Sequence, residues 1–195
     1  MKTHILNSLN QSQDMLTAFL SNADNITNIE NGARLLINTL KNHGSIYSCG
    51  NGGSMSDAMH FAEELSGRYR KSRGGLSATA ISDPGHITCV ANDFGYEHIF
   101  SRYLEANAND GDCLLAISTS GTSKNVIKAI EYAKQNDIYV ISLTGPANTA
   151  VGQLVDCDIH AGPSEFADRV QEIHIKVIHT LIELVEREFF PENYR

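Results

Sequence analysis

The sequence predicts an α/β protein in which a doubly wound, five-stranded parallel sheet is flanked by helices and preceded by N-terminal helices. Short apolar runs alternate with longer amphipathic runs over residues 44–195, which is the pattern of strands joined by crossover helices. The run at 113–117 is apolar throughout, as expected for a central strand covered on both faces. Turns rich in glycine or serine follow two of these runs, at the strand ends where such sheets bind ligands.

Two helices are predicted at residues 4–20 and 27–42, separated by the polar segment 21–25. Their apolar residues recur at helical spacing, and the pair His43 and Gly44 is a typical helix stop. The first helix lacks the uninterrupted apolar stretch of a signal peptide. Each helix has one apolar face to bury, and we expect the pair to pack against a partner subunit.

The first strand is predicted at 46–49, and Ser54 is predicted to cap a helix over 55–70. The other predicted strands lie at 77–81, 113–117, 138–143 and 155–160. The other predicted helices lie shortly after 85 and at 96–107, 124–135 and 166–190, with loops at 82–85 and 91–95. We interpret residues 1–195 as one domain, composed of N-terminal helices (1–43) and an α/β core with a C-terminal helix (44–195).

The composition excludes several function classes. The formal net charge of −8 argues against a nucleic acid as the main partner. No apolar run reaches the length of a membrane span, so we expect no membrane partner. The cysteines lie far apart in apolar runs without zinc-finger spacing, and we predict that all four are reduced core thiols: Cys49, Cys89, Cys113 and Cys157.

The glycine turn at 50–53 lies between the first strand and the helix that follows it. Unpaired N–H groups and the helix dipole both face such a turn, so it suits an anion. On this helix His60 and Glu64 are one turn apart and project on the same side. A solvated helix face with a Glu64–Arg68 ion pair is the competing interpretation. The turn lacks the spacing of a dinucleotide-binding G-x-G-x-x-G motif.

The loop at 118–123 offers several hydroxyl groups and backbone N–H groups at the start of a helix, directly after a buried strand. This combination suits a phosphate group. The loop differs from a Walker A loop, which requires a Gly-Lys-Ser/Thr sequence. A serine-rich loop that only caps its helix is the alternative.

In the last helix, Gln171 heads an apolar stripe with Ile175 and Ile178, an unusual place for an amide without a partner. His179 lies at the edge of this stripe, whereas His174 is interpreted as structural. If the last helix faces the helix after the glycine turn, two imidazoles and a carboxylate meet, which suits zinc or general acid–base catalysis. The sequence spacing leaves open whether the helices meet.

Several motifs together resemble one family over nearly the whole chain: CGNGGS, HFAEEL, NDFG, LLAISTSG, FADR and QEIHIKVIH. The chain resembles the bacterial phosphoheptose isomerases, which are sugar isomerase (SIS) domain proteins. The resemblance implies isomerisation of D-sedoheptulose 7-phosphate to D-glycero-D-manno-heptose 7-phosphate, an early step toward the ADP-heptose of the lipopolysaccharide core. It also implies a cytoplasmic homotetramer that binds zinc and a pocket that draws on more than one subunit.

The resemblance assigns expected roles to individual residues. Glu64 and His179 match the family's acid–base pair, with Glu64 expected to move the C–H proton and His179 the oxygen proton; the reverse assignment stays open. Asp168 lies in a matching segment without a defined role. The expected zinc ligands are His60, Glu64, Gln171 and His179. The expected substrate contacts are Asn51, Gly52, Gly53, Glu64, Asn92, Asp93 and Gln171, with the phosphate held by Ser118, Thr119, Ser120 and Ser123.

Two functions of other classes compete with the isomerase. One is a non-catalytic SIS protein that binds the replication initiator DnaA, a relative that does not retain the full set of Glu and His residues found here. The other is a SIS sensor that regulates transcription, which usually carries an attached helix-turn-helix domain. We expect no room for such a domain in 195 residues.

Overall fold

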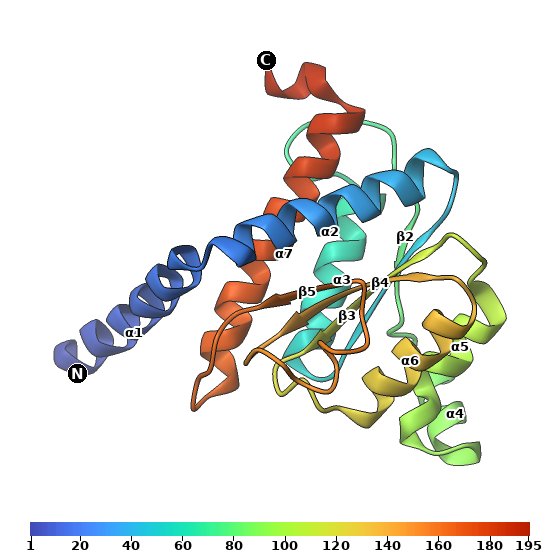
Figure 1. Cartoon of the computed structure of the whole chain (residues 1–195), viewed down its shortest axis with the longest axis horizontal. Helices are drawn as coiled ribbons and strands as arrows, with labels where there is room; N and C mark the ends of the chain where they lie inside the picture. Colours follow the sequence, from blue (N-terminus) through green and yellow to red (C-terminus); the bar gives the residue numbers. More distant parts are fainter.

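The computed structural model describes residues 1–195 and contains a five-stranded parallel sheet between layers of helices (Figure 1). The strands are β1 (Ile46–Gly50), β2 (Ala78–Ala80), β3 (Cys113–Ser118), β4 (Tyr139–Thr144) and β5 (Cys157–His160). Their order in the sheet is β2-β1-β3-β4-β5, and every neighbouring pair is parallel. The chain winds from β1 to one edge and from β3 to the other, which confirms the predicted doubly wound sheet.

Helices α2, α3 and α7 cover one face of the sheet, and α4, α5 and α6 cover the other (Figure 1). Helix α1 projects beyond the sheet at the N-terminus (Figure 1). None of the helices combines the length and apolar character needed to cross a bilayer. The helices are α1 (Lys2–Ser21), α2 (Ala23–Lys41), α3 (Gly53–Ser66), α4 (Pro84–Asp93), α5 (Ile99–Asn107), α6 (Lys124–Gln135) and α7 (Ala167–Phe189), with short 3-10 helices η1 (Tyr96–His98) and η2 (Pro191–Tyr194).

Strand β3 is buried along its whole length and separates two apolar cores. Its alternate side chains point to opposite layers: Leu115 packs into the core under α2, α3 and α7, and Leu114 into the core under α4, α5 and α6. In the register, Ile117 pairs with Gly50 of β1, and Ser118 pairs with Thr144 of β4. The glycine turn (50–53) and the loop at 118–123, called the serine loop below, therefore leave the sheet at the same ends of neighbouring strands. This is the point where the winding direction changes.

The ends of two helices differ from the prediction. Helix α2 begins at Ala23, because the side chain of Asn22 accepts the N–H of Asp24 at 3.1 Å and caps it. Ser54 is not a cap: it is buried within α3, and Gly52 (φ 57°) precedes the helix and accepts the N–H of Met55. Helix α3 also ends at Ser66, earlier than predicted, since Gly67 follows as its C-cap and Arg73 hydrogen-bonds the carbonyls of its last turn.

Three other predictions fail on the opposite face of the sheet. The loop predicted at 91–95 is in large part helix, because α4 continues to Asp93 from a strong start in which the Asp83 side chain accepts the N–H of His86 at 2.7 Å. The helix predicted at 96–107 is divided into η1 and α5. Cys89 is exposed on α4, so it is not a core thiol; the other three cysteines are buried as predicted.

His174 is fully buried on α7, which confirms its structural interpretation. Its Nε2 lies 2.9 Å from the carbonyl oxygen of Thr144, so Nε2 carries the hydrogen and donates. Its Nδ1 has no hydrogen-bond partner. Burial lowers the pKa of His174 to about 4, because the charged imidazolium is poorly solvated there.

This burial predicts a loss of stability in acid. The unfolded histidine titrates near pH 6.5, so between that value and about pH 4 the unfolded chain binds more protons and stability falls as the pH falls. From about pH 7.5 to about pH 5, the wild type is expected to lose about 2 kcal/mol more than a His174→Gln variant. Urea unfolding of both proteins at both pH values measures this difference. Other titrating groups, such as Asp57, whose pKa burial raises to about 6, are present in both proteins, so their contributions cancel in this difference. Equal losses of stability in the two proteins would contradict the prediction.

Candidate functional site

The predicted meeting of two helices is present: α3 and α7 lie side by side on one face of the sheet (Figure 1). Nε2 of His60 on α3 lies 3.1 Å from Nε2 of His179 on α7. The same His60 Nε2 lies 3.5 Å from Oε1 of Glu64, one helical turn away. Three of the four expected zinc ligands therefore converge, although His60 and His179 are 119 residues apart.

Packing of the two helices orients these side chains. On α3 the apolar residues Ala58, Phe61 and Leu65 are buried against the sheet, which leaves His60 and Glu64 on a partly exposed flank. On α7, Val177 and Ile178 are buried beside His179. The side chains of His60 and Glu64 are 39% and 18% exposed, so the cluster remains accessible to a small molecule from solvent.

Partial burial shifts the titration of two groups in the cluster. It raises the pKa of Glu64, with a further upward contribution from the charge of Glu63. It lowers the pKa of His179, with a further downward contribution from His60. Both shifts disfavour the charged side chain. A neutral imidazole at His179 has a nitrogen lone pair that is free to accept a proton or bind a metal ion.

Two separations in the cluster, both measured from His60, are close to those expected around a zinc ion. A tetrahedral zinc with bonds of about 2.0–2.1 Å to nitrogen sets its ligand atoms roughly 3.3–3.4 Å apart. The observed separations at His60 are 3.1 Å to His179 and 3.5 Å to Glu64. The exposed Glu63 also belongs to the neighbourhood, because ligand-type atoms of His60, Glu63 and Glu64 all lie within 4.8 Å of one another. The sequence analysis missed Glu63, which its position three residues after His60 would have indicated.

Gln171, the fourth expected zinc ligand, lies against the glycine turn and makes no hydrogen bond to His60 or His179. A β-carbon at Gly53 would lie 2.5 Å from Nε2 of Gln171 and 2.8 Å from its Oε1. A side chain at Gly53 would therefore shift this amide. The contact joins the N-terminal part of α7 to the first residue of α3 and places the partly buried amide beside the turn.

The serine loop lies at the N-terminus of α6, next to the glycine turn along the sheet edge. Ser118 donates from its hydroxyl to Ser123 Oγ at 3.1 Å. The Oγ of Ser120 accepts from Thr122 N at 3.3 Å, and Gly121 adopts a positive φ of 65°. The loop closes tightly, and its backbone and hydroxyl groups are positioned around the start of the helix, as in anion sites.

Asn51 belongs to this edge of the sheet, whereas three other candidate residues are bonded elsewhere. Asn92 donates to Asp93 at 2.7 Å; both are exposed at the end of α4, and neither bonds another predicted site residue. Asp168 is exposed in the first turn of α7, where it accepts the N–H of Arg169. Within one chain, no hydrogen bond connects these three residues to the His60 cluster, which consists of His60, Glu64 and His179.

Comparison with known proteins identifies the family. A family model described as the SIS domain matches residues 9–145. The phosphoheptose isomerase of Histophilus somni is 57% identical over 178 residues, which are 91% of this chain and 91% of that protein. The chain belongs to the SIS domain family and, within it, to the phosphoheptose isomerases.

Solved structures of the same family have the same fold. A phosphoheptose isomerase from Francisella tularensis superposes with a TM-score of 0.88 at 31% identity, covering 96% of this chain and 99% of that one. The phosphoheptose isomerase of Neisseria gonorrhoeae superposes with a TM-score of 0.86 at 33% identity, covering 95% of this chain and 98% of that one. The resemblance found in the sequence motifs is confirmed over nearly the whole chain.

Proposed function

We propose that this member of the phosphoheptose isomerases interconverts D-sedoheptulose 7-phosphate and D-glycero-D-manno-heptose 7-phosphate through an enediolate. The product would supply ADP-heptose for the lipopolysaccharide core. The observation that carries the proposal is the convergence of Glu64 and His179 on His60, between α3 and α7. More than half of the residues are shared with a protein named phosphoheptose isomerase.

The reaction moves a proton between two adjacent carbons and redistributes the protons on their oxygens. It requires a base that can return the proton and an acid–base partner for the oxygens. We assign the carbon-bound proton to Glu64, whose raised pKa brings it closer to neutral pH, and the oxygen protons to His179. When bound, zinc supplies a positive charge that stabilises the enediolate oxygens. The ligand and base roles compete at Glu64, because coordination lowers its basicity.

Four residues are proposed to hold zinc: His60, Glu64, Gln171 and His179. The distances around His60 support three of them. Gln171 is supported by its position against Gly53 at the start of α3. Imidazole and carboxylate groups are ordinary zinc ligands.

The sugar phosphate is proposed to lie along the sheet edge. Its phosphate would occupy the serine loop, and its carbon chain would extend past the glycine turn to the His60 cluster. The phosphate contacts are Ser118, Thr119, Ser120 and Ser123. The remaining proposed contacts are Asn51, Gly52, Gly53, Glu64, Asn92, Asp93 and Gln171.

Removal of the loop hydroxyls tests the phosphate contacts. A Ser120→Ala, Ser123→Ala double variant is expected to raise KM for sedoheptulose 7-phosphate by roughly 10-fold or more, since each hydrogen bond to a charged group contributes about 1.5–3 kcal/mol. Turnover of phosphate-free sedoheptulose should be slow and equal in variant and wild type. Steady-state kinetics with both sugars measures the effect. If the wild type uses the two sugars equally well, the serine loop does not hold the phosphate.

The activity itself is tested by NMR. Purified protein is treated with a chelator, divided, and reloaded with zinc or left metal-free before sedoheptulose 7-phosphate is added. We expect the anomeric signals of the aldose product only in the zinc-loaded sample. The absence of product from zinc-loaded protein would contradict the proposed function, and equal rates in both samples would contradict the zinc role.

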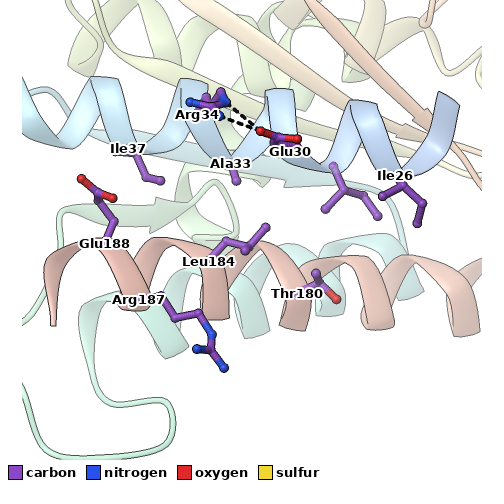
Figure 2. A pocket seen from close by; sticks show the side chains of 10 residues that line it. Ile26, Glu30, Ala33, Arg34, Ile37, Thr180, Leu184, Arg187 and Glu188 are labelled. Carbon is purple, nitrogen blue, oxygen red and sulfur yellow. Dashed lines mark hydrogen bonds and ion pairs between the residues drawn. The ribbon is translucent and has the colours of Figure 1, made fainter. Parts of the chain in front are cut away.

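We also propose that the enzyme is a homotetramer. Its support is apolar surface left open in one chain: Leu6 and Leu9 are 60% and 64% exposed on α1. A groove of about 560 Å³ lies between α2 and α7, with Ile26 and Leu184 in its lining (Figure 2). A pocket shared between subunits would also give Asn92 and Asp93 a place in the site. Light scattering should give about four times the chain mass.

The compartment and the alternatives follow from the same observations. We propose a cytoplasmic location, supported by four cysteines that form no disulfide. The single-domain organisation of residues 1–195 remains part of the proposal. Neither the relatives nor the site geometry supports a non-catalytic protein that binds DnaA.

A further inference from the structure

A reciprocal amide pair joins the glycine turn to the start of α6. Nδ2 of Asn51 donates to Oδ1 of Asn125 at 2.9 Å, and Nδ2 of Asn125 donates to Oδ1 of Asn51 at 2.7 Å. Asn125 is only 3% exposed and is the second residue of α6. Its side chain therefore faces a residue 74 positions earlier in the chain, in the turn proposed to contact substrate.

The backbone fixes which way both amides point. The N–H of Val126 can only donate, and it lies 3.0 Å from Oδ1 of Asn125, so the oxygen of Asn125 must be at that position. The nitrogen of Asn125 then faces Asn51, whose oxygen accepts it. Tyr96 donates from its hydroxyl to the same Asn51 oxygen at 3.0 Å.

A count of donors and acceptors shows what Asn51 has left for a ligand. Its oxygen has two lone pairs, which are used by Asn125 and Tyr96. Its nitrogen has two hydrogens, of which one is used by Asn125. One N–H donor remains. Asn51 can therefore bind an oxygen lone pair of a ligand but cannot accept a hydrogen bond from a sugar hydroxyl.

The same side chain also frees a hydroxyl in the serine loop. The N-cap of α6 is Ser123, whose side chain would ordinarily bond the N–H two or three residues on. Here the Asn125 oxygen bonds that Val126 N–H instead, and Ser123 makes no capping bond and pairs with Ser118. Asn125 thus bonds the glycine turn and takes the place of Ser123 as the side chain that caps α6.

We propose that Asn125 is a positioning residue that holds the Asn51 amide with one N–H directed at an oxygen of the sugar phosphate. Tyr96 completes this arrangement from η1. The inference rests on the proposed substrate role of Asn51. It goes further than that role in two respects. Asn51 would contact the substrate through a single N–H donor, and the buried Asn125, which does not touch the substrate, would determine this.

A double-mutant cycle on the full-length, zinc-loaded protein tests the proposal. Asn125→Ala is expected to lower kcat/KM for sedoheptulose 7-phosphate by about 10- to 100-fold, since a misplaced contact group costs on this order. Asn51→Ala should cost at least as much. Because Asn125 acts through Asn51, the double variant should match Asn51→Ala within about twofold. Asn136→Ala, at the other end of α6 and bonded only to the Tyr132 carbonyl, is the control and should match the wild type.

Stability is measured on the same samples to separate positioning from folding. Loss of the bond between the Asn125 oxygen and the Val126 N–H should lower the melting temperature of both variants that lack Asn125. Because Asn51 and Asn125 bond each other, their effects on stability are not expected to add, so kcat/KM is compared at a temperature at which every variant is folded. Multiplicative losses in kcat/KM, or an Asn125→Ala variant within twofold of wild type, would overturn the inference. If Asn125→Ala does not fold, Asn125→Ser, which keeps an oxygen near the start of α6, replaces that variant in the cycle. Failure of both variants to fold would also overturn the inference.

The outcome is distinguishable from failure of the proposed function. Wild-type protein that turns over the substrate but shows no coupling between Asn51 and Asn125 contradicts the positioning role alone. Zinc-loaded wild-type protein that neither binds the sugar phosphate by calorimetry nor turns it over contradicts the function, and the positioning role falls with it.

Discussion

Replacement of Glu64 by glutamine is expected to lower kcat by about 10²- to 10⁴-fold, the usual contribution of a general acid or base. The amide is nearly the same size as the carboxylate but cannot take a proton from carbon. Glu64 lies on α3, whereas the proposed phosphate contacts lie in the serine loop, so binding of the sugar phosphate should persist. Turnover is measured by NMR, and binding by calorimetry, on Glu64→Gln and on Glu105→Gln, which removes an exposed carboxylate of α5 that pairs with Arg102.

Zinc content separates the two roles proposed for Glu64. A variant that retains zinc but not turnover supports the assignment of Glu64 as the base. A variant that loses both supports the ligand role and shifts the base assignment toward His179. Full turnover by Glu64→Gln with intact substrate binding would contradict the base role. Glu105→Gln is expected to resemble the wild type in all three measurements.

Loss of the buried ion pair between Arg73 and Glu186 is expected to have the largest effect on stability. Their side chains are 1% and 0% exposed, and Nε of Arg73 lies 2.7 Å from Oε1 of Glu186. Tyr194 donates to the second carboxylate oxygen at 2.7 Å. Arg73 also donates to the carbonyls of Glu64 and Leu65, each at 2.6 Å. The pair therefore fastens the last turn of α3, which carries Glu64, to α7.

Glu186→Ala is expected to destabilise the protein by about 3–5 kcal/mol, because it leaves the guanidinium buried without its partner. For a chain of this size, each kcal/mol corresponds to roughly 2–4 °C in melting temperature. Lys128→Ala is the control: its ion pair with Glu131 is about half exposed, and such pairs contribute about 0–1 kcal/mol. Thermal unfolding at one fixed protein concentration compares the two, since assembly would make stability concentration-dependent. Equal shifts would contradict the account of the ion pair.

Much of the fold could be predicted because local patterns determine it. The apolar run of β3 and the strong amphipathic pattern of α6 predicted a buried central strand and a helix that begins and ends at the observed residues. Helix ends were predicted less well. Helix α3 ends at Ser66, where Gly67 follows as the C-cap and Arg73 hydrogen-bonds the carbonyls of the last turn; the prediction that α3 continues to residue 70 overlooked this glycine.

The site could be predicted only in part from spacing. The positions of His60 and Glu64 one turn apart indicated a shared face, but their meeting with His179 depends on the packing of α3 against α7. Family resemblance supplied that expectation. Neither approach singled out Asn125 or Arg73, since each acts through a partner distant in sequence: Asn51 for the first and Glu186 for the second.

The zinc affinity of single variants tests most directly whether α3 and α7 together form one metal site. We predict that the wild type binds one zinc ion per chain and that His60→Ala and His179→Ala each weaken binding by more than about 100-fold, since even changes outside the ligand set cost 10- to 100-fold. His4→Ala, on the exposed surface of α1, should bind like the wild type. Competition titrations with a coloured chelator give the four affinities. Equal affinities for all four proteins would show that the two helices do not share a zinc ion and would contradict the proposed active site.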